Sequence, residues 1–200
     1  NYSKKKHQLT LMSKNFGFIL VKPQLGENIG ACARSLKNFG FSDLNIVSPK
    51  QSWPNHKAKV TSVGAYDLIK KAKIFKNTRE AINKYTIVIS LSARKRDINK
   101  KHISINQFLK IIQTKKNTKF GLMFGPEASG LTNEDLSLSN FILQIPTSKK
   151  LKSMNLSHSL TLICYEIFKL KNSKKFSKNS KNIKISSKRQ ISSLLLHLKN

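Results

Sequence analysis

The sequence predicts an α/β domain built on a mostly parallel β-sheet. Short apolar runs recur along the chain, and segments with a helical pattern separate them, which is the alternation typical of parallel sheets flanked by helices. The length of 200 residues suits one ordinary domain with a short appendage. In such sheets, ligands bind in loops at the carboxyl ends of the strands. The functional residues are therefore expected in those loops.

Each predicted strand is a continuous apolar run, as expected of a strand that is buried on both faces. In chain order the runs are FGFILV at 16–21, LNIV at 44–47, IVISL at 87–91, FGLMF at 120–124 and FILQI at 141–145. Helices are predicted at 28–39, 78–85, 105–114 and 155–170. Asn77 and Glu80 have the spacing of a capping box before the second helix, and Ser104 is the expected cap of the third.

The two ends of the chain differ from its body in composition. Met12 opens a plausible start, and the segment after the last predicted helix is basic and lacks an apolar period until a short amphipathic stretch near the C-terminus. Four segments are therefore expected: an N-terminal tail at 1–11, the folded domain at 12–170, a basic linker at 171–186 and the start of a C-terminal helical extension at 187–200.

The chain carries 38 Lys and Arg against 9 Asp and Glu, a formal net charge of +29. Such a surface attracts nucleic acid through counterion release. Lysine far outnumbers arginine, and Lys, Asn and Ile are abundant together, so a lysine-rich surface that reflects an A/T-rich coding sequence is the alternative. No apolar run approaches the roughly 18 residues that a membrane helix needs, so no membrane partner is expected.

The cysteines and the N-terminus indicate a compartment. Cys32 and Cys164 are far apart and show no CxxC spacing, which argues against a zinc site or a disulfide framework and fits a reducing cytoplasm. The basic N-terminus has no apolar segment and is not typical of a secretory signal. A cytoplasmic protein without a metal site is expected.

The first motif is GENIGACAR at 26–34, directly after the first predicted strand. A helix that starts near Asn28 offers free N–H groups and positive potential to an anion, and small residues let it lie close to the sheet. Arg34 follows just under two turns into this helix. The alternative is an ordinary glycine-rich turn with a surface arginine, since the motif is neither GxGxxG nor a P-loop.

The second and third motifs follow the last two predicted strands. FGLMFGPEASGLT at 120–132 places Glu127 at the carboxyl end of a strand, where the alternative is a carboxylate that caps or pairs locally. IPTSKKLKSMNLSHS at 145–159 brings Ser153 and Asn155 to the start of the last helix, where the alternative is a simple N-cap by Ser153. His158 is expected to be a surface histidine, because nothing in the sequence pairs it with a carboxylate or a nucleophile.

Taken together and in this order, the three motifs resemble the SpoU-type branch of the SPOUT RNA methyltransferases. That family carries Asn-Ile-Gly…Arg, Phe-Gly-x-Glu-x-x-Gly-Leu and Ile-Pro…Ser-Leu-Asn-Leu-Ser motifs, and the resemblance covers about residues 16–170. The segment ISLSARKR at 89–96 is similar to the Gly-Thr-Ser-Ala-Arg-x-Arg stretch of the TrmJ-like subgroup, whose members methylate the 2′-hydroxyl of the pyrimidine at position 32 of tRNA.

The resemblance implies a C-terminal deep trefoil knot whose loops hold S-adenosylmethionine in a bent form. Leu91 stands where the family usually has Thr, and Met154 where it has Leu. By position, the implied cofactor contacts are Leu91, Ser92, Ala93, Gly125, Ile145, Lys152, Ser153 and Met154.

The resemblance also implies a catalytic set for methyl transfer to a ribose 2′-oxygen, without a metal. Arginine is a permanent cation, so we interpret Arg34 as a group that holds a substrate phosphate and the developing alkoxide, in place of the general base often assigned to it. Asn28, Glu127, Ser153 and Asn155 are expected to orient Arg34 and shape the pocket.

One RNA partner and one assembly follow from the resemblance and the charge. We expect tRNA as substrate, contacted by Arg34, Arg94 and Arg96, and a homodimer that forms near the active site. The apolar residues of the last helix exceed what one sheet face requires, which also favours a dimer; the alternative is a monomer in which the C-terminal helix at 191–198 covers that face. Two alternatives stay open: a 2′-O-methyltransferase for ribosomal RNA or another tRNA position, and an RNA-binding protein with an inactive site.

Overall fold

The structure is a computed structural model that describes residues 14–93, 99–115 and 117–176, together with Lys188, Arg189, Leu196 and Leu198. Its centre is one seven-stranded sheet with the order β3-β2-β1-β6-β4-β7-β5. Every pair of neighbouring strands is parallel. The strands are β1 (Phe16–Val21), β2 (Asp43–Val47), β3 (Lys73–Phe75), β4 (Ile87–Leu91), β5 (Lys101–Ile103), β6 (Phe120–Phe124) and β7 (Phe141–Leu143). The predicted α/β class with a parallel sheet is confirmed.

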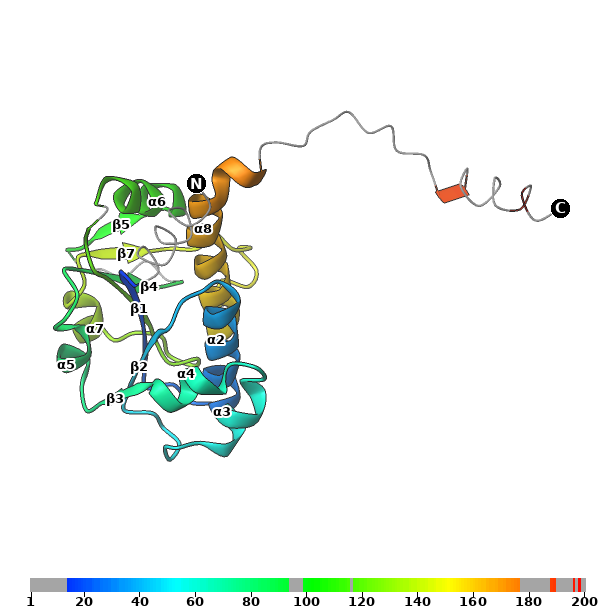
Figure 1. The fold of residues 1–200 in the computed structure, drawn as a ribbon. Coiled ribbons are helices and arrows are strands. Elements are labelled where there is room, and N and C mark those ends of the chain that lie inside the picture. Colours follow the sequence, from blue (N-terminus) through cyan, green and yellow to red (C-terminus); the bar gives the residue numbers. More distant parts are fainter. Residues whose placement is uncertain are drawn as a thin grey trace.

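Helices cover both faces of this sheet (Figure 1). They are α2 (Gly26–Asn38), α3 (His56–Thr61), α4 (Tyr66–Lys71), α5 (Thr78–Ile82), α6 (Ile105–Thr114), α7 (Asn133–Ser137) and α8 (Leu156–Phe176). Helices α5 and α7 lie on one side, and α2, α3, α4 and α8 lie on the other (Figure 1). No helix among the described residues has the length and apolar character needed to cross a membrane.

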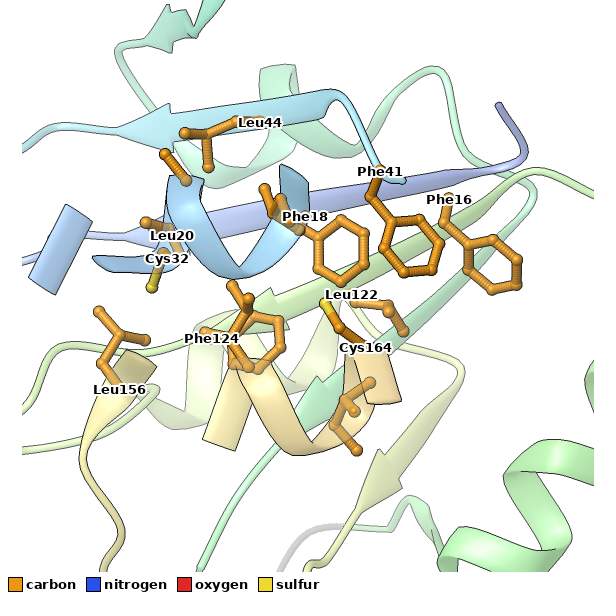
Figure 2. Packing of buried hydrophobic residues seen from close by; sticks show 14 of the residues in the cluster. Phe16, Phe18, Leu20, Cys32, Phe41, Leu44, Leu122, Phe124, Leu156 and Cys164 are labelled. Atoms are coloured by element: carbon orange, nitrogen blue, oxygen red, sulfur yellow. The ribbon is translucent and has the colours of Figure 1, made fainter. Parts of the chain in front are cut away.

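The core lies in two layers because successive strand residues point to opposite faces. Phe16, Phe18 and Leu20 of β1 face the α2 and α8 side, whereas Ile19 and Val21 face the α5 and α7 side. Figure 2 shows the first layer, in which Phe and Leu side chains of the sheet meet the buried cysteines Cys32 and Cys164. Burial on both faces explains why the central strands read as continuous apolar runs.

The predicted strands were found with small differences at their ends. The bounds of β1, β4 and β6 are as predicted, β2 begins one residue earlier, and β7 ends at Leu143, two residues early. Strands β3 and β5 were not predicted. They are the two edges of the sheet, three residues each, and both begin with an exposed lysine, so neither forms an apolar run.

Side-chain caps fix several helix starts. Asn77 accepts a hydrogen bond from the Glu80 backbone N–H at 3.0 Å, and Ser104 forms a capping box with Gln107. Helix α8 continues to Phe176, six residues beyond the predicted end, so the expected basic linker at 171–186 begins within a helix. The expected tail at 1–11 and almost all of the expected extension at 187–200 lie outside the described residues.

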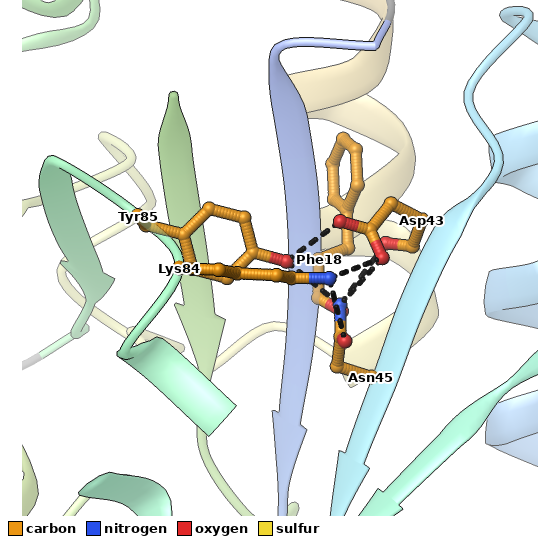
Figure 3. Close-up of polar contacts among 5 residues, drawn as sticks. All are labelled: Phe18, Asp43, Asn45, Lys84 and Tyr85. Atoms are coloured by element: carbon orange, nitrogen blue, oxygen red, sulfur yellow. Dashed lines mark hydrogen bonds and ion pairs between the residues drawn. The ribbon is translucent and has the colours of Figure 1, made fainter. Parts of the chain in front are cut away.

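A polar network ties β1 and β2 to Lys84 and Tyr85, which lie between α5 and β4 (Figure 3). Tyr85 donates to Asp43 at 2.8 Å, Lys84 forms an ion pair with Asp43 at 2.8 Å, and buried Asn45 donates to the Tyr85 hydroxyl at 2.9 Å. A side chain at Gly17 would place its Cβ 1.8 Å from the Tyr85 hydroxyl, so glycine is required there. Burial and the Asp43 charge together raise the pKa of Tyr85.

Candidate active site

The carboxyl ends of β4, β6 and β7 surround a cavity. The loop after β6 closes one wall by folding back on itself, because a Cβ at Gly125 would lie 2.3 Å from the Leu131 backbone N and Gly130 adopts a φ of 69°. All eight residues expected to contact the cofactor line this cavity, namely Leu91, Ser92, Ala93, Gly125, Ile145, Lys152, Ser153 and Met154. Residues from three distant segments therefore share one cavity.

The three motifs meet beside this cavity in a chain of hydrogen bonds, which we call the motif cluster: Asn28, Glu127 and Asn155. The Asn28 amide donates to Glu127 Oε1 at 2.7 Å, and the Asn155 amide donates to Asn28 Oδ1 at 3.1 Å. The other Glu127 oxygen, Oε2, accepts the Gln24 backbone N–H at 2.8 Å. Glu127 therefore joins segments about 100 residues apart and is not a local cap.

The start of helix α8 differs from the simple N-cap that the third motif also allowed. Asn155 Oδ1 accepts the backbone N–H groups of Ser157 at 2.8 Å and His158 at 3.4 Å, so Asn155 and not Ser153 caps the helix. Ser153 lines the cavity and has no hydrogen bond to the motif cluster. His158 is exposed, as expected.

Arg34 is exposed on α2, nearly two turns after Asn28. Within the described part of the chain, no hydrogen bond or ion pair holds its guanidinium group. Three of the four residues expected to orient Arg34, namely Asn28, Glu127 and Asn155, bind one another, so that role stays a prediction. Arg94 and Arg96 lie outside the described residues.

Cys32 lies on α2 and is fully buried. Burial raises the pKa of the Cys32 thiol, and the negative charge of Glu127 adds to this effect. The thiol is therefore neutral at physiological pH and does not act as a nucleophile. In the described ranges, no group of three or more His, Cys, Asp and Glu side chains could hold a metal ion.

Helix α8 presents an apolar edge next to α2. Leu160, Ile163 and Ile167 are fully buried in the core, so they do not contribute to a free face. Phe39, directly after α2, packs against Tyr165 and Phe168 at centroid distances of 6.2 and 5.6 Å, and Tyr165 is 46% exposed. Part of the excess apolar surface expected for this helix lies in a small aromatic patch, Phe39, Tyr165 and Phe168.

Sequence reasoning missed a shallow hollow that also borders Glu127. It is lined by Gln24, Leu25, Lys50, Gln51 and Glu127, from the loops that follow β1, β2 and β6. Polar residues directly after two neighbouring parallel strands were the available signal, since such loops meet at one edge of the sheet.

Known proteins resemble this chain over the part that carries the three motifs. A model of the SpoU rRNA Methylase family matches residues 15–165. The chain is 40% identical over 162 residues to the tRNA (cytidine-2'-O-)-methyltransferase TrmJ of Methanocaldococcus jannaschii, which covers 79% of this chain and 69% of that protein. It is 32% identical over 151 residues to the tRNA (cytidine/uridine/adenosine-2'-O-)-methyltransferase TrmJ of Pseudomonas aeruginosa, which covers 74% of this chain and 58% of that relative.

Solved structures agree with these relatives. The crystal structure of TrmJ from Z. mobilis ZM4 superposes with a TM-score of 0.73 at 32% identity, over 92% of this chain and 78% of that one. The SpoU methyltransferase AviRb from Streptomyces viridochromogenes, in complex with the cofactor AdoMet, shares the fold with a TM-score of 0.63 at 18% identity, over 82% of this chain and 58% of that one.

Proposed function

Because the chain belongs to the SpoU rRNA methylase family, we propose that it transfers a methyl group from S-adenosylmethionine to a ribose 2′-hydroxyl of tRNA. The observation that carries this proposal is the motif cluster, which stands at the rim of a cavity lined by every residue expected to contact the cofactor. The tRNA 2′-O-methyltransferases among the relatives support the substrate.

The lining of the cavity fits S-adenosylmethionine. Leu143, Ile145 and Met154 offer apolar walls for a purine ring, while Ser92 and Lys152 offer polar groups for the ribose and the carboxylate. When bound, this cofactor supplies a methyl group that its positively charged sulfur activates for transfer.

The protein's own groups then align the acceptor and stabilise charge. The 2′-oxygen gains the methyl group and loses its proton to solvent, and negative charge develops on that oxygen. Arg34 is a permanent cation on the open side of α2, so we assign it to that oxygen and to a neighbouring phosphate. The motif cluster fixes the start of α2 beside the cavity, and Asn28, Glu127 and Asn155 are therefore positioning residues.

The finer substrate follows the TrmJ-like segment at 89–96 and the relatives named for cytidine and uridine. We assign the methylated nucleotide to the anticodon-loop pyrimidine at position 32, with Arg94 and Arg96 as RNA contacts, in the cytoplasm. The alternative is ribosomal RNA, which the description of the family model names.

A homodimer is part of the proposal. The aromatic patch of Phe39, Tyr165 and Phe168 lies at the end of α2 and on α8, and Arg34 is exposed on the same helix α2. A second copy that covers this patch would place two active sites near one interface.

The deciding experiment maps ribose methylation by mass spectrometry. tRNA and ribosomal RNA from cells with and without the gene are compared, and the purified protein is then given S-adenosylmethionine and the unmodified RNA. We expect one ribose methyl group in tRNA that depends on the gene and that the purified protein restores. If the methyl group that is missing without the gene lies in ribosomal RNA, the substrate is ribosomal RNA and not tRNA. Binding of S-adenosylmethionine with no RNA methylated would favour an inactive RNA-binding protein.

A further inference from the structure

The hollow lined by Glu127 adjoins the motif cluster and neighbours the cofactor cavity, because Glu127 lines both. We call it the donor hollow: Gln24, Leu25, Lys50, Gln51 and Glu127. A nucleotide whose ribose reaches the cofactor cavity past Glu127 would carry its base toward this hollow. A role for the hollow in choosing that base rests on the proposed function, because it presupposes that a ribose is methylated in the cavity.

Two glutamines in the donor hollow have fixed orientations. Gln24 Oε1 accepts the Ala128 backbone N–H at 2.9 Å, and Gln51 Oε1 accepts the Gly26 backbone N–H at 3.2 Å. A backbone N–H group can only donate, so each amide must turn its oxygen toward the protein and its NH2 group away from it. Within the described ranges, neither NH2 group has a hydrogen-bond partner or is buried.

The loops that carry these glutamines are held firmly. The Asn55 amide donates to Gln51 Oε1 at 3.0 Å, and the Lys50 backbone N–H donates to the Pro23 carbonyl oxygen at 3.0 Å. A Cβ at Gly26 would lie 2.0 Å from Asn55 Oδ1, so the two loops are in close contact. The orientation of the Gln51 amide is therefore set before any ligand binds.

The free polar groups of the donor hollow are hydrogen-bond donors. They are the two amide NH2 groups and the exposed ammonium group of Lys50, while the Glu127 oxygens already accept three N–H groups, from Gln24, Leu25 and Asn28. Leu25 is 46% exposed and adds an apolar surface. This combination suits the edge of a flat ring that carries acceptor atoms.

Nucleobases differ at the edge that lies beside the ribose. Pyrimidines present the O2 acceptor there and adenine presents N3, whereas guanine adds an exocyclic NH2 donor at the same edge. A donor facing a donor leaves both groups without a partner, which is costly once water is excluded. We propose that Gln24 and Gln51 read this ribose-side edge of the methylated nucleotide, accept cytosine, uracil and adenine, and reject guanine.

The test varies the base at the methylated position. The wild-type protein is assayed on tRNA transcripts that carry cytidine, uridine, adenosine, guanosine or inosine there, because inosine is guanosine without the exocyclic amino group. We expect kcat/KM for guanosine to be at least about tenfold below that for cytidine, and inosine to recover most of this loss. Equal rates for guanosine and inosine would overturn the inference.

Matched variants test the glutamines themselves. Gln51→Glu and Gln24→Glu keep the inward acceptor and replace the outward donor by an acceptor, so the guanosine-to-cytidine ratio of kcat/KM should rise about tenfold or more in each. Gln113→Glu, on an exposed site of α6, is the control for added charge and should leave the ratio unchanged. Binding of S-adenosylmethionine by calorimetry verifies that each variant is folded, and two glutamine variants keep the test open if one fails to fold.

The two possible failures are distinguishable. An unchanged ratio in the folded glutamine variants, with normal methylation of tRNA, would overturn the role of the donor hollow and leave the proposed function intact. Methylation of none of the five transcripts by the wild-type protein would overturn the proposed function, and this inference with it.

Discussion

At the scale of single residues, Glu127 is the side chain that connects the three motifs of the site. Its two oxygens accept hydrogen bonds from Gln24, Leu25 and Asn28, and through Asn28 they reach Asn155. Glu127→Gln keeps the shape but turns one acceptor into a donor that faces N–H groups. We expect a loss of about 1–3 kcal/mol in the free energy of unfolding, measured in urea, together with a loss of methylation.

Glu134→Gln is the control for Glu127, since Glu134 is exposed in the first turn of α7. Its effect on unfolding should be within about 0.5 kcal/mol. If Glu127→Gln unfolds at the same urea concentration as this control, the carboxylate does not hold the three motifs together.

The proposed role of Arg34 in catalysis can be tested directly by substitution. It is exposed and lies on the helix that the motif cluster anchors. Arg34→Ala should lower kcat by about 10²–10³, the usual cost of removing one group that stabilises a developing oxyanion, while S-adenosylmethionine binds unchanged.

Arg79→Ala provides the matched comparison for Arg34, because Arg79 is an exposed arginine on α5, on the other side of the sheet. Kinetics with saturating tRNA separate the two variants. Turnover retained by Arg34→Ala, with a normal affinity for the cofactor, would show that the cation at position 34 is not needed.

The sequence could predict some site residues and not others, for physical reasons. Glu127 was predictable because a carboxylate at the carboxyl end of a buried strand lies where ligands bind. The roles of Gln24 and Gln51 were not, because a glutamine in a loop donates or accepts according to which backbone group meets its oxygen. That Asn155 and not Ser153 caps α8 also depends on loop geometry, since both residue types cap helices well.

At the scale of elements, burial decides which strands the sequence reveals. Strands β1 and β6 are buried along their whole length and could be predicted to the residue. The edge strand β3 is as exposed as a loop, because Lys73 and Ile74 are both exposed. Only its hydrogen-bonded pairing with β2 in the folded sheet makes it a strand. The local pattern of apolar residues therefore predicts the central strands of this sheet, whereas the edge strands depend on pairing in the folded protein.

Tyr85 binds residues of β2, and its titration predicts how the stability of the protein depends on pH. The pKa of Tyr85 is raised in the folded protein by burial and by Asp43, whereas an unfolded tyrosine titrates near about 10. The folded state then keeps a proton that the unfolded state releases. The stabilisation is complete below pH about 10 and is lost above it, by up to about 1.4 kcal/mol per pH unit.

Tyr85→Phe removes this titration and also the hydrogen bond to Asp43. We expect it to be less stable at pH 8 by about 1–3 kcal/mol, and to lose less stability than the wild type between pH 10 and 11. Urea unfolding at both pH values measures this, with Tyr66→Phe on the exposed face of α4 as control. Parallel alkaline losses in wild type and Tyr85→Phe would contradict the assignment.

At the scale of the whole molecule, we expect the proposed homodimer to form through the aromatic patch of Phe39, Tyr165 and Phe168. Analytical ultracentrifugation at micromolar concentration should give twice the chain mass of 22.7 kDa. Tyr165→Asp places a charge in the patch and should shift the protein to the monomer, whereas Tyr66→Asp on α4 should not. A wild-type monomer would exclude the dimer.

The charge of the whole chain gives the last prediction. Of the net charge of +29, the segment 177–200 contributes six cations and no acid. Helix α8 continues to Phe176 and buries Asn172, so truncation belongs after residue 176 and leaves the core and the cofactor cavity complete. Each cation that neutralises a phosphate steepens the fall of tRNA affinity with salt.

Deleting 177–200 should therefore weaken tRNA binding at low salt and reduce the slope of log K against log salt concentration by up to about 4, while S-adenosylmethionine binds unchanged. A full-length variant with the six cations replaced by glutamine separates charge from chain length. If charge is the cause, this variant binds tRNA as the truncated protein does. If it binds as the wild type does, the segment contributes contacts other than ion pairs. Equal slopes for all three proteins would assign tRNA affinity to the folded domain alone, where the cations of the carboxyl edge of the sheet, Lys50 and Lys152 among them, surround the site.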